Sequence, residues 1–145
     1  MADKYIDIDT LKYMLYDVHQ LEELFKRDRF VDHDKESIDL FLESNKDFAD
    51  KELFPFVKEM DEQPAYYKDG KVYVHDQVKT MMHKGGELGV ISASFDYDDG
   101  GMQIPLLAHT AAYFILDAAN NHLPGYAGLT QGAAELIIHF ANKAL

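Results

Sequence analysis

The sequence contains no cysteine and no tryptophan. The absence of cysteine excludes a disulfide framework, a thiolate metal site and a cysteine nucleophile. The motifs of a serine nucleophile elbow, a phosphate-binding loop and an HExxH zinc site are also missing. Spacing along the chain therefore names no catalytic residue.

Positive charge is scarce as well. Lys and Arg number 14 against 26 Asp and Glu, so the formal net charge is −12. A chain this acidic repels phosphate backbones, and we expect no nucleic-acid partner. Hydrophobic residues make up 47% and charged residues 28%, which is typical of a soluble globular domain. No signal-like start and no membrane-length apolar run is present, so we expect no membrane span and a cytoplasmic location.

Charge is especially rare near the end of the chain. Between residues 102 and 145 the charged side chains are Asp117, Glu135 and Lys143. Helices exposed to water usually carry a charged face, so this stretch is expected to be mostly buried. The last helical pattern also reaches the final residue without a glycine or proline stop signal. We expect a longer chain that continues past residue 145 and covers these helices.

The spacing of apolar residues predicts an all-α fold: an up-and-down bundle of about five helices. Helices are expected over 11–25, over 38–60 with a kink at Pro55, over 76–87, from Pro105 to about 118, and from 126 onward. Between the second and third helices, aromatic and β-branched residues flank Asp69-Gly70. This pattern predicts a small β-hairpin excursion over Tyr66–Val74.

Two sequence patterns could indicate a metal site. Glu135 and His139 lie four residues apart, as two ligands on one helix face would. Without a second such pair, a helix hydrogen bond or a buried neutral histidine explains them better. Residues 96–101 (DYDDGG) resemble a calcium loop, but Gly100 occupies the fifth position, where an oxygen ligand is needed. No metal site is predicted.

A stripe of residues without bulky side chains is the most suggestive local feature. Pro124, Gly128 and Gly132 are four apart, so they share one face if the last helix begins near Gly125. A glycine inside a helix costs about 1 kcal/mol relative to alanine, so two on one face suggest a packing or functional reason. The stripe allows either the close approach of a neighbouring helix or a groove for a long apolar ligand.

Three segments taken in order resemble the N-terminal helical domain of acyl-CoA dehydrogenases. Residues 95–101 (FDYDDGG) occupy the place of a P-E-x-Y-G-G-type loop, although Asp98-Asp99 departs from the usual residues. Residues 125–137 (GYAGLTQGAAELI) are similar to the helix that precedes the flavin-binding middle domain, and 48–55 (FADKELFP) to an early helix. The resemblance implies a short N-terminal extension over 1–33 and the family's α-domain over 34–145, with the middle and C-terminal domains absent.

The family carries out α,β-dehydrogenation of acyl-CoA thioesters with non-covalent FAD, and its members are usually homodimers or homotetramers. The resemblance implies an acyl-CoA substrate, an electron-transfer acceptor and FAD for the full-length protein, with no flavin expected on residues 1–145. It supplies no catalytic residue here, and this part alone is expected to be inactive. By the same resemblance, Pro124, Gly128 and Gly132 would face the acyl tail, and small side chains there would deepen the pocket. The alternative is a freestanding acidic helical module that binds a partner protein.

Overall fold

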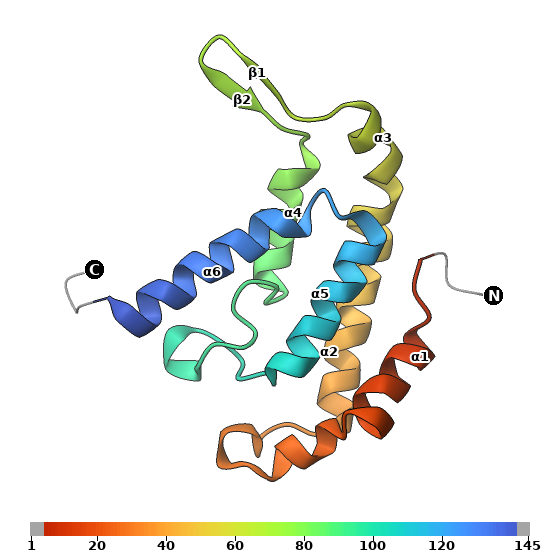
Figure 1. Cartoon of the computed structure of the whole chain (residues 1–145), viewed down its shortest axis with the longest axis vertical. Helices are drawn as coiled ribbons and strands as arrows, with labels where there is room; N and C mark the ends of the chain where they lie inside the picture. The colour runs from red at the N-terminus through yellow and green to blue at the C-terminus, as the bar shows by residue number, and fades with distance from the viewer. Residues whose placement is uncertain (1–4, 142–145) are drawn as a thin grey trace.

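The computed structural model describes residues 5–141, which are helical except for one hairpin and the loops (Figure 1). The helices are α1 (Ile8–Tyr13), α2 (Lys35–Phe48), α3 (Val57–Glu62), α4 (Gln77–Glu87), α5 (Leu106–Asn120) and α6 (Pro124–Phe140). Strands β1 (Tyr66–Lys68) and β2 (Lys71–Tyr73) form an antiparallel hairpin. Two short segments are π-helical: η1 (Met14–Val18) and η4 (Ala49–Leu53). Four are 3₁₀-helical: η2 (Leu21–Lys26), η3 (Asp28–Phe30), η5 (Phe54–Phe56) and η6 (Tyr97–Asp99). The predicted fold, helical with a small hairpin, is confirmed.

The N-terminal part departs from the prediction of one continuous helix over 11–25. Helix α1 begins after Asp7, whose side chain accepts hydrogen bonds from the backbone N–H groups of the first turn. The helical path then breaks at Gln20, whose φ of 51° is left-handed. The reason is tertiary, because the break lets both Leu15 and Leu21 reach the core, at 3% and 0% exposure.

Pro55 interrupts the second helix, as predicted. The π-turn η4 precedes it, the 3₁₀ turn η5 contains it, and α3 continues to Glu62. Proline lacks an N–H and disturbs the helical ladder, so carbonyl oxygens near the kink need other donors. The Nδ2 of Asn120 donates to the Leu53 carbonyl at 3.0 Å, and the Nε2 of Gln77 donates to the Glu52 carbonyl at 2.7 Å. Side chains from α4 and α5 thus hold the kink in place.

The hairpin projects from one end of the molecule (Figure 1). Asp69 and Gly70 both have positive φ, 50° and 78°, as a type I′ hairpin turn requires. All six strand residues are exposed. Tyr66 and Tyr73 stack across the strands with ring centroids 5.0 Å apart.

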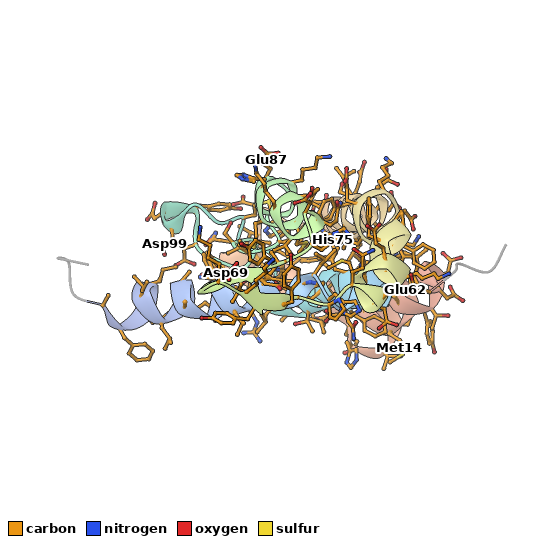
Figure 2. All side chains as sticks on the ribbon, turned by 90° about the horizontal axis from the view of Figure 1, so that it is seen from above. Met14, Glu62, Asp69, His75, Glu87 and Asp99 are labelled. Atoms are coloured by element: carbon orange, nitrogen blue, oxygen red, sulfur yellow. The ribbon has the colours of Figure 1, made fainter. Side chains whose placement is uncertain are left out.

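Helices α5 and α6 differ in how well the rest of the chain covers them. Helix α5 packs against α2 and contributes eight buried residues, whereas α6 buries only Pro124 and Ala127. Leu129 and Phe140 on α6 are 81% and 82% exposed. Figure 2 shows the end of α6 extending beyond the rest of the molecule. The expected burial therefore holds for α5, while residues 5–141 leave most of α6 uncovered. No described helix combines the length and hydrophobicity needed to cross a membrane.

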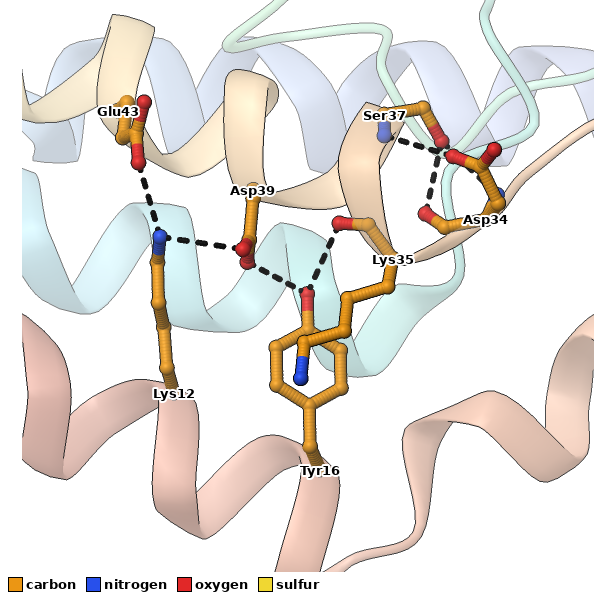
Figure 3. Close-up of polar contacts among 7 residues, drawn as sticks. All are labelled: Lys12, Tyr16, Asp34, Lys35, Ser37, Asp39 and Glu43. Carbon is orange, nitrogen blue, oxygen red and sulfur yellow. Dashed lines mark hydrogen bonds and ion pairs between the residues drawn. The ribbon is translucent and has the colours of Figure 1, made fainter.

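The N-terminal residues share the hydrophobic core of the remainder. Ile6, Leu15 and Leu21 belong to the same buried cluster as residues of α2, α4 and α5. A polar network also joins α1 and η1 to α2 (Figure 3). In it the ammonium of Lys12 lies 2.9 Å from Glu43 and 3.3 Å from Asp39. The Tyr16 hydroxyl donates to Asp39 at 2.8 Å. The buried cluster thus includes residues on both sides of the predicted boundary at residue 33, and the division into two segments stays a prediction.

Candidate functional site

A mostly apolar groove lies between α5 and the first half of α6. Its volume is about 220 Å³, and it is lined by Leu106, His109, Thr110, Tyr113, Gly128 and Gln131. The α5 residues His109 and Tyr113 are four apart and therefore lie on one helix face. The groove thus combines an apolar wall with two buried polar groups.

The three residues of the predicted stripe have different surroundings in the structure. Pro124 begins α6 and is buried, and Gly128 lines the groove. A Cβ added at Gly128 would lie 3.7 Å from Tyr113 Cε1 and 3.8 Å from its hydroxyl oxygen. At Gly132 an added Cβ would meet nothing within 4 Å. Close helix packing therefore does not explain Gly132, because its face is open within the described part of the chain.

The hydroxyl of Tyr113 is the unusual polar group of this site. It is buried, and no group among residues 5–141 forms a hydrogen bond with it. Burial, with smaller contributions from Asp117 and Glu135, raises the pKa of the Tyr113 phenol to about 12. The phenol is therefore protonated at neutral pH and able to donate a hydrogen bond next to Gly128. The sequence analysis did not single out Tyr113, and its only signal was the spacing from His109.

His109 connects α5 to the turn that follows α4. Its Nε2 lies 2.9 Å from the Val90 carbonyl oxygen, and its Nδ1 lies 3.1 Å from the Ser94 hydroxyl. A carbonyl only accepts, so Nε2 carries the proton and Nδ1 accepts from Ser94. Burial lowers the pKa of His109 below its ordinary value of 6.5. The neutral ring is thus part of the packing beneath the groove.

We expect His109 to make stability depend on pH between about 7.5 and 5.5. Below its ordinary pKa of 6.5, the unfolded chain binds a proton at this position while the folded chain resists it. This contribution to stability is therefore complete above 6.5 and is lost as the pH falls. Urea unfolding at pH 7.5, 6.5 and 5.5 measures the effect, which should be smaller in His109→Gln. The matched control is His83→Gln, because His83 is exposed. Equal pH dependence in all three proteins would contradict the assignment.

A second hollow, of about 210 Å³, lies between η6, η3 and the second half of α6. It is lined by Arg29, Ser94, Phe95, Asp96, Asp99, Glu135, Ile138 and His139. Arg29 forms an ion pair with Asp96, which leaves Asp99 and Glu135 as an acidic excess. The Nδ1 of His139 donates to the Glu135 carbonyl at 2.9 Å, the helix hydrogen bond favoured for this pair. Within residues 5–141 no cluster of three acidic, His or Cys side chains is arranged to hold a metal ion.

Comparison with known proteins gives one match. The family described as acyl-CoA dehydrogenase, N-terminal domain, matches residues 35–145. No curated protein and no solved structure matches the chain. Since the matched region is more than half of the chain, the protein belongs to the acyl-CoA dehydrogenase family.

Proposed function

We propose that this chain supplies one wall of the acyl pocket in an FAD-dependent acyl-CoA dehydrogenase, and that it is inactive alone. The observation that carries the proposal is the groove at Gly128, together with the exposed apolar side chains elsewhere on α6, among them Leu129, Leu136 and Phe140. A monomeric soluble protein rarely exposes a long apolar surface unless a ligand or another domain covers it. Membership of this family supports an acyl-CoA thioester as the ligand. An electron-transfer acceptor, a homo-oligomer and a cytoplasmic location belong to the same proposal.

In this proposal the acyl tail lies along α6, over Gly128 and toward Gly132. The tail is apolar, and so is most of the groove wall. The open space at Gly132 adds length beyond Gly128, and buried Pro124 anchors the start of the helix. The proposed substrate class is therefore a long or bulky acyl chain.

The described residues do not by themselves suit a flavin. The diphosphate of FAD needs hydrogen-bond donors or cations. The hollow beside the second half of α6 has an excess of carboxylates instead, from Asp99 and Glu135. We propose that other parts of the full-length enzyme hold the cofactor.

A visible spectrum of the product of the complete gene tests the proposal. The expected result is a yellow protein whose flavin absorbance is bleached when an acyl-CoA is added. A colourless product that releases no flavin on denaturation would overturn the enzymatic proposal. The alternative, an acidic helical module that binds a partner through α6, would then become the better explanation.

Replacing Gly128 by leucine should shift the full-length enzyme toward short acyl-CoAs. The larger side chain would fill the groove next to Tyr113 and so shorten the space for the tail. The measurement is kcat/KM for a series of chain lengths. We expect the long-to-short ratio to fall by about tenfold or more, because a single methylene in an apolar pocket is worth about 1–3 kcal/mol.

Gly125→Leu is the matched control for this substitution. Gly125 lies in the same helix, is exposed, and has nothing within 4 Å of an added Cβ. Its replacement should leave the ratio unchanged. The proposed position of the tail is wrong if Gly128→Leu also leaves chain-length preference unchanged while the enzyme stays folded.

A further inference from the structure

Charge is distributed unevenly between the two ends of this molecule. Residues 5–62 contain 17 Asp and Glu against 8 Lys and Arg, whereas residues 63–86 contain four Lys against two Asp. The hairpin lies in the second segment and projects from one end, while α2 begins near the opposite end (Figure 1). A basic projection and an acidic helix are thus well separated within one copy.

One face of the hairpin combines aromatic rings with positive charge. Tyr66 pairs with Tyr73, and Lys68 pairs with Lys71 directly across the strands. Alternate residues of a strand share a face, so these four side chains form one exposed surface, the Tyr–Lys face. Like charges directly opposite each other in a hairpin are destabilising. Neither lysine forms an ion pair with any described residue, so an anionic partner would remove this repulsion.

The exposed side of α2 has the complementary composition. Successive intervals of four, three and four residues align one exposed ridge, which we call the α2 ridge: Glu36, Leu40, Glu43 and Asp47. Leu40, at its centre, is 65% exposed. Beside it lies a surface hollow of about 520 Å³, lined by Lys35, Glu36, Asp39, Leu40 and Glu43. The ridge therefore offers an apolar centre with carboxylates on both sides. Glu43 and Asp47 already pair with Lys12 and Lys51 of the same copy, whereas Glu36 forms no ion pair with a described residue.

We propose that the Tyr–Lys face of one copy docks on the α2 ridge of a second copy. The stacked tyrosines would cover Leu40, and the two lysines would face Glu36 and Glu43. Both surfaces lie on the same chain, but the hairpin projects from one end of the molecule while α2 begins near the other, so the contact forms between copies and not within one. In a two-fold dimer the contact occurs twice, once in each direction. Short strands ending in lysine are poor templates for edge pairing, which favours docking through the face.

The size of the surfaces sets the expected affinity. A hairpin face of four residues is smaller than the roughly 800 Å² per partner of a standard interface, so even the doubled contact should be weak and transient. Exposed ion pairs are screened by salt, so association should weaken as ionic strength rises. We expect dimers of the 145-residue chain at about 100 μM and low salt, with a dissociation constant at least tenfold weaker in 0.5 M NaCl.

A charge exchange measured by sedimentation velocity tests the proposal. One variant reverses the hairpin with Lys68→Glu and Lys71→Glu, and the other reverses the ridge with Glu36→Lys and Glu43→Lys. Each variant alone places like charges at both contacts and should be monomeric. Their equimolar mixture restores opposite charges at both contacts and should associate as the unmodified chain does. Lys58→Glu is the control, because Lys58 is exposed and lies outside both surfaces.

Several outcomes would overturn the proposal. One is an unmodified chain that stays monomeric at 100 μM and low salt. Another is a hairpin variant that associates as strongly as the unmodified chain, which would assign association to a different surface such as α6. A mixture that remains monomeric would also refute the pairing. Circular dichroism checks that the variants are folded, and Leu40→Ser tests the ridge without disturbing the Lys12–Glu43 ion pair.

Discussion

Replacing Asn120 by alanine is expected to lower the free energy of unfolding by about 2–3 kcal/mol. Its side chain is 1% exposed and donates to the Leu53 carbonyl at the Pro55 kink. Alanine would leave that buried carbonyl without this donor, and a buried polar group that loses its partner costs about 1–3 kcal/mol. The Oδ1 of Asn120 also accepts from the backbone N–H of His122, in the turn between α5 and α6. The substitution therefore loosens two connections together.

Asn121→Ala is the natural control for this prediction. Asn121 is the next residue, is exposed, and is the C-cap of the same helix. Its replacement should change stability by less than about 0.5 kcal/mol. Urea unfolding followed by circular dichroism measures both variants. Equal stabilities for the two would show that the Leu53 carbonyl does not depend on Asn120.

Deletion of residues 1–33 should abolish cooperative folding of the remainder. The deleted part contributes Ile6, Leu15 and Leu21 to the common core, at 7%, 3% and 0% exposure. Each buried side chain of this size contributes about 1.5–3 kcal/mol. The total is comparable to the whole stability of a typical domain, about 5–15 kcal/mol. The side of α2 that Lys12 and Tyr16 contact would also become exposed to water.

Point variants distinguish the loss of core packing from the removal of the whole segment 1–33. Leu21→Ala should cost about 2–5 kcal/mol because it leaves a cavity in the core. Val18→Ala should cost less than about 0.5 kcal/mol, since Val18 is 48% exposed. The family match begins at residue 35, close to the predicted boundary at 33. A fragment 34–145 that unfolds cooperatively with unchanged stability would establish the N-terminal segment as a separate extension.

Local patterns predicted most helices and the hairpin because their determinants are near one another in the chain. The helix expected over 76–87 is α4, at Gln77–Glu87, and the one expected after Pro105 is α5. Asp69-Gly70 specifies the hairpin turn through its positive φ angles. The N-terminal run is the exception. Its apolar spacing fits one helix, but Gln20 turns the chain so that Leu15 and Leu21 both reach the core.

The candidate site was predicted only in part. Spacing placed Pro124, Gly128 and Gly132 on one helix face, but it did not show which of them face a neighbour. That depends on how far α5 extends beside α6. Tyr113 was missed because a tyrosine among alanines and leucines looks like ordinary core. Its distinguishing feature, a buried hydroxyl without a hydrogen-bond partner in the described structure, exists only once α6 lies over it.

By itself the amino-acid order determined the helical class, the hairpin, the kink at Pro55 and the resemblance to one enzyme family. These follow from backbone preferences and short-range periodicity, which act over a few residues. The tertiary structure alone decided that residues 5–25 join the main core, that Asn120 supports the kink, and that residues 5–141 leave α6 largely uncovered. Those outcomes depend on contacts between residues far apart in the chain, and no local pattern encodes which distant surfaces meet.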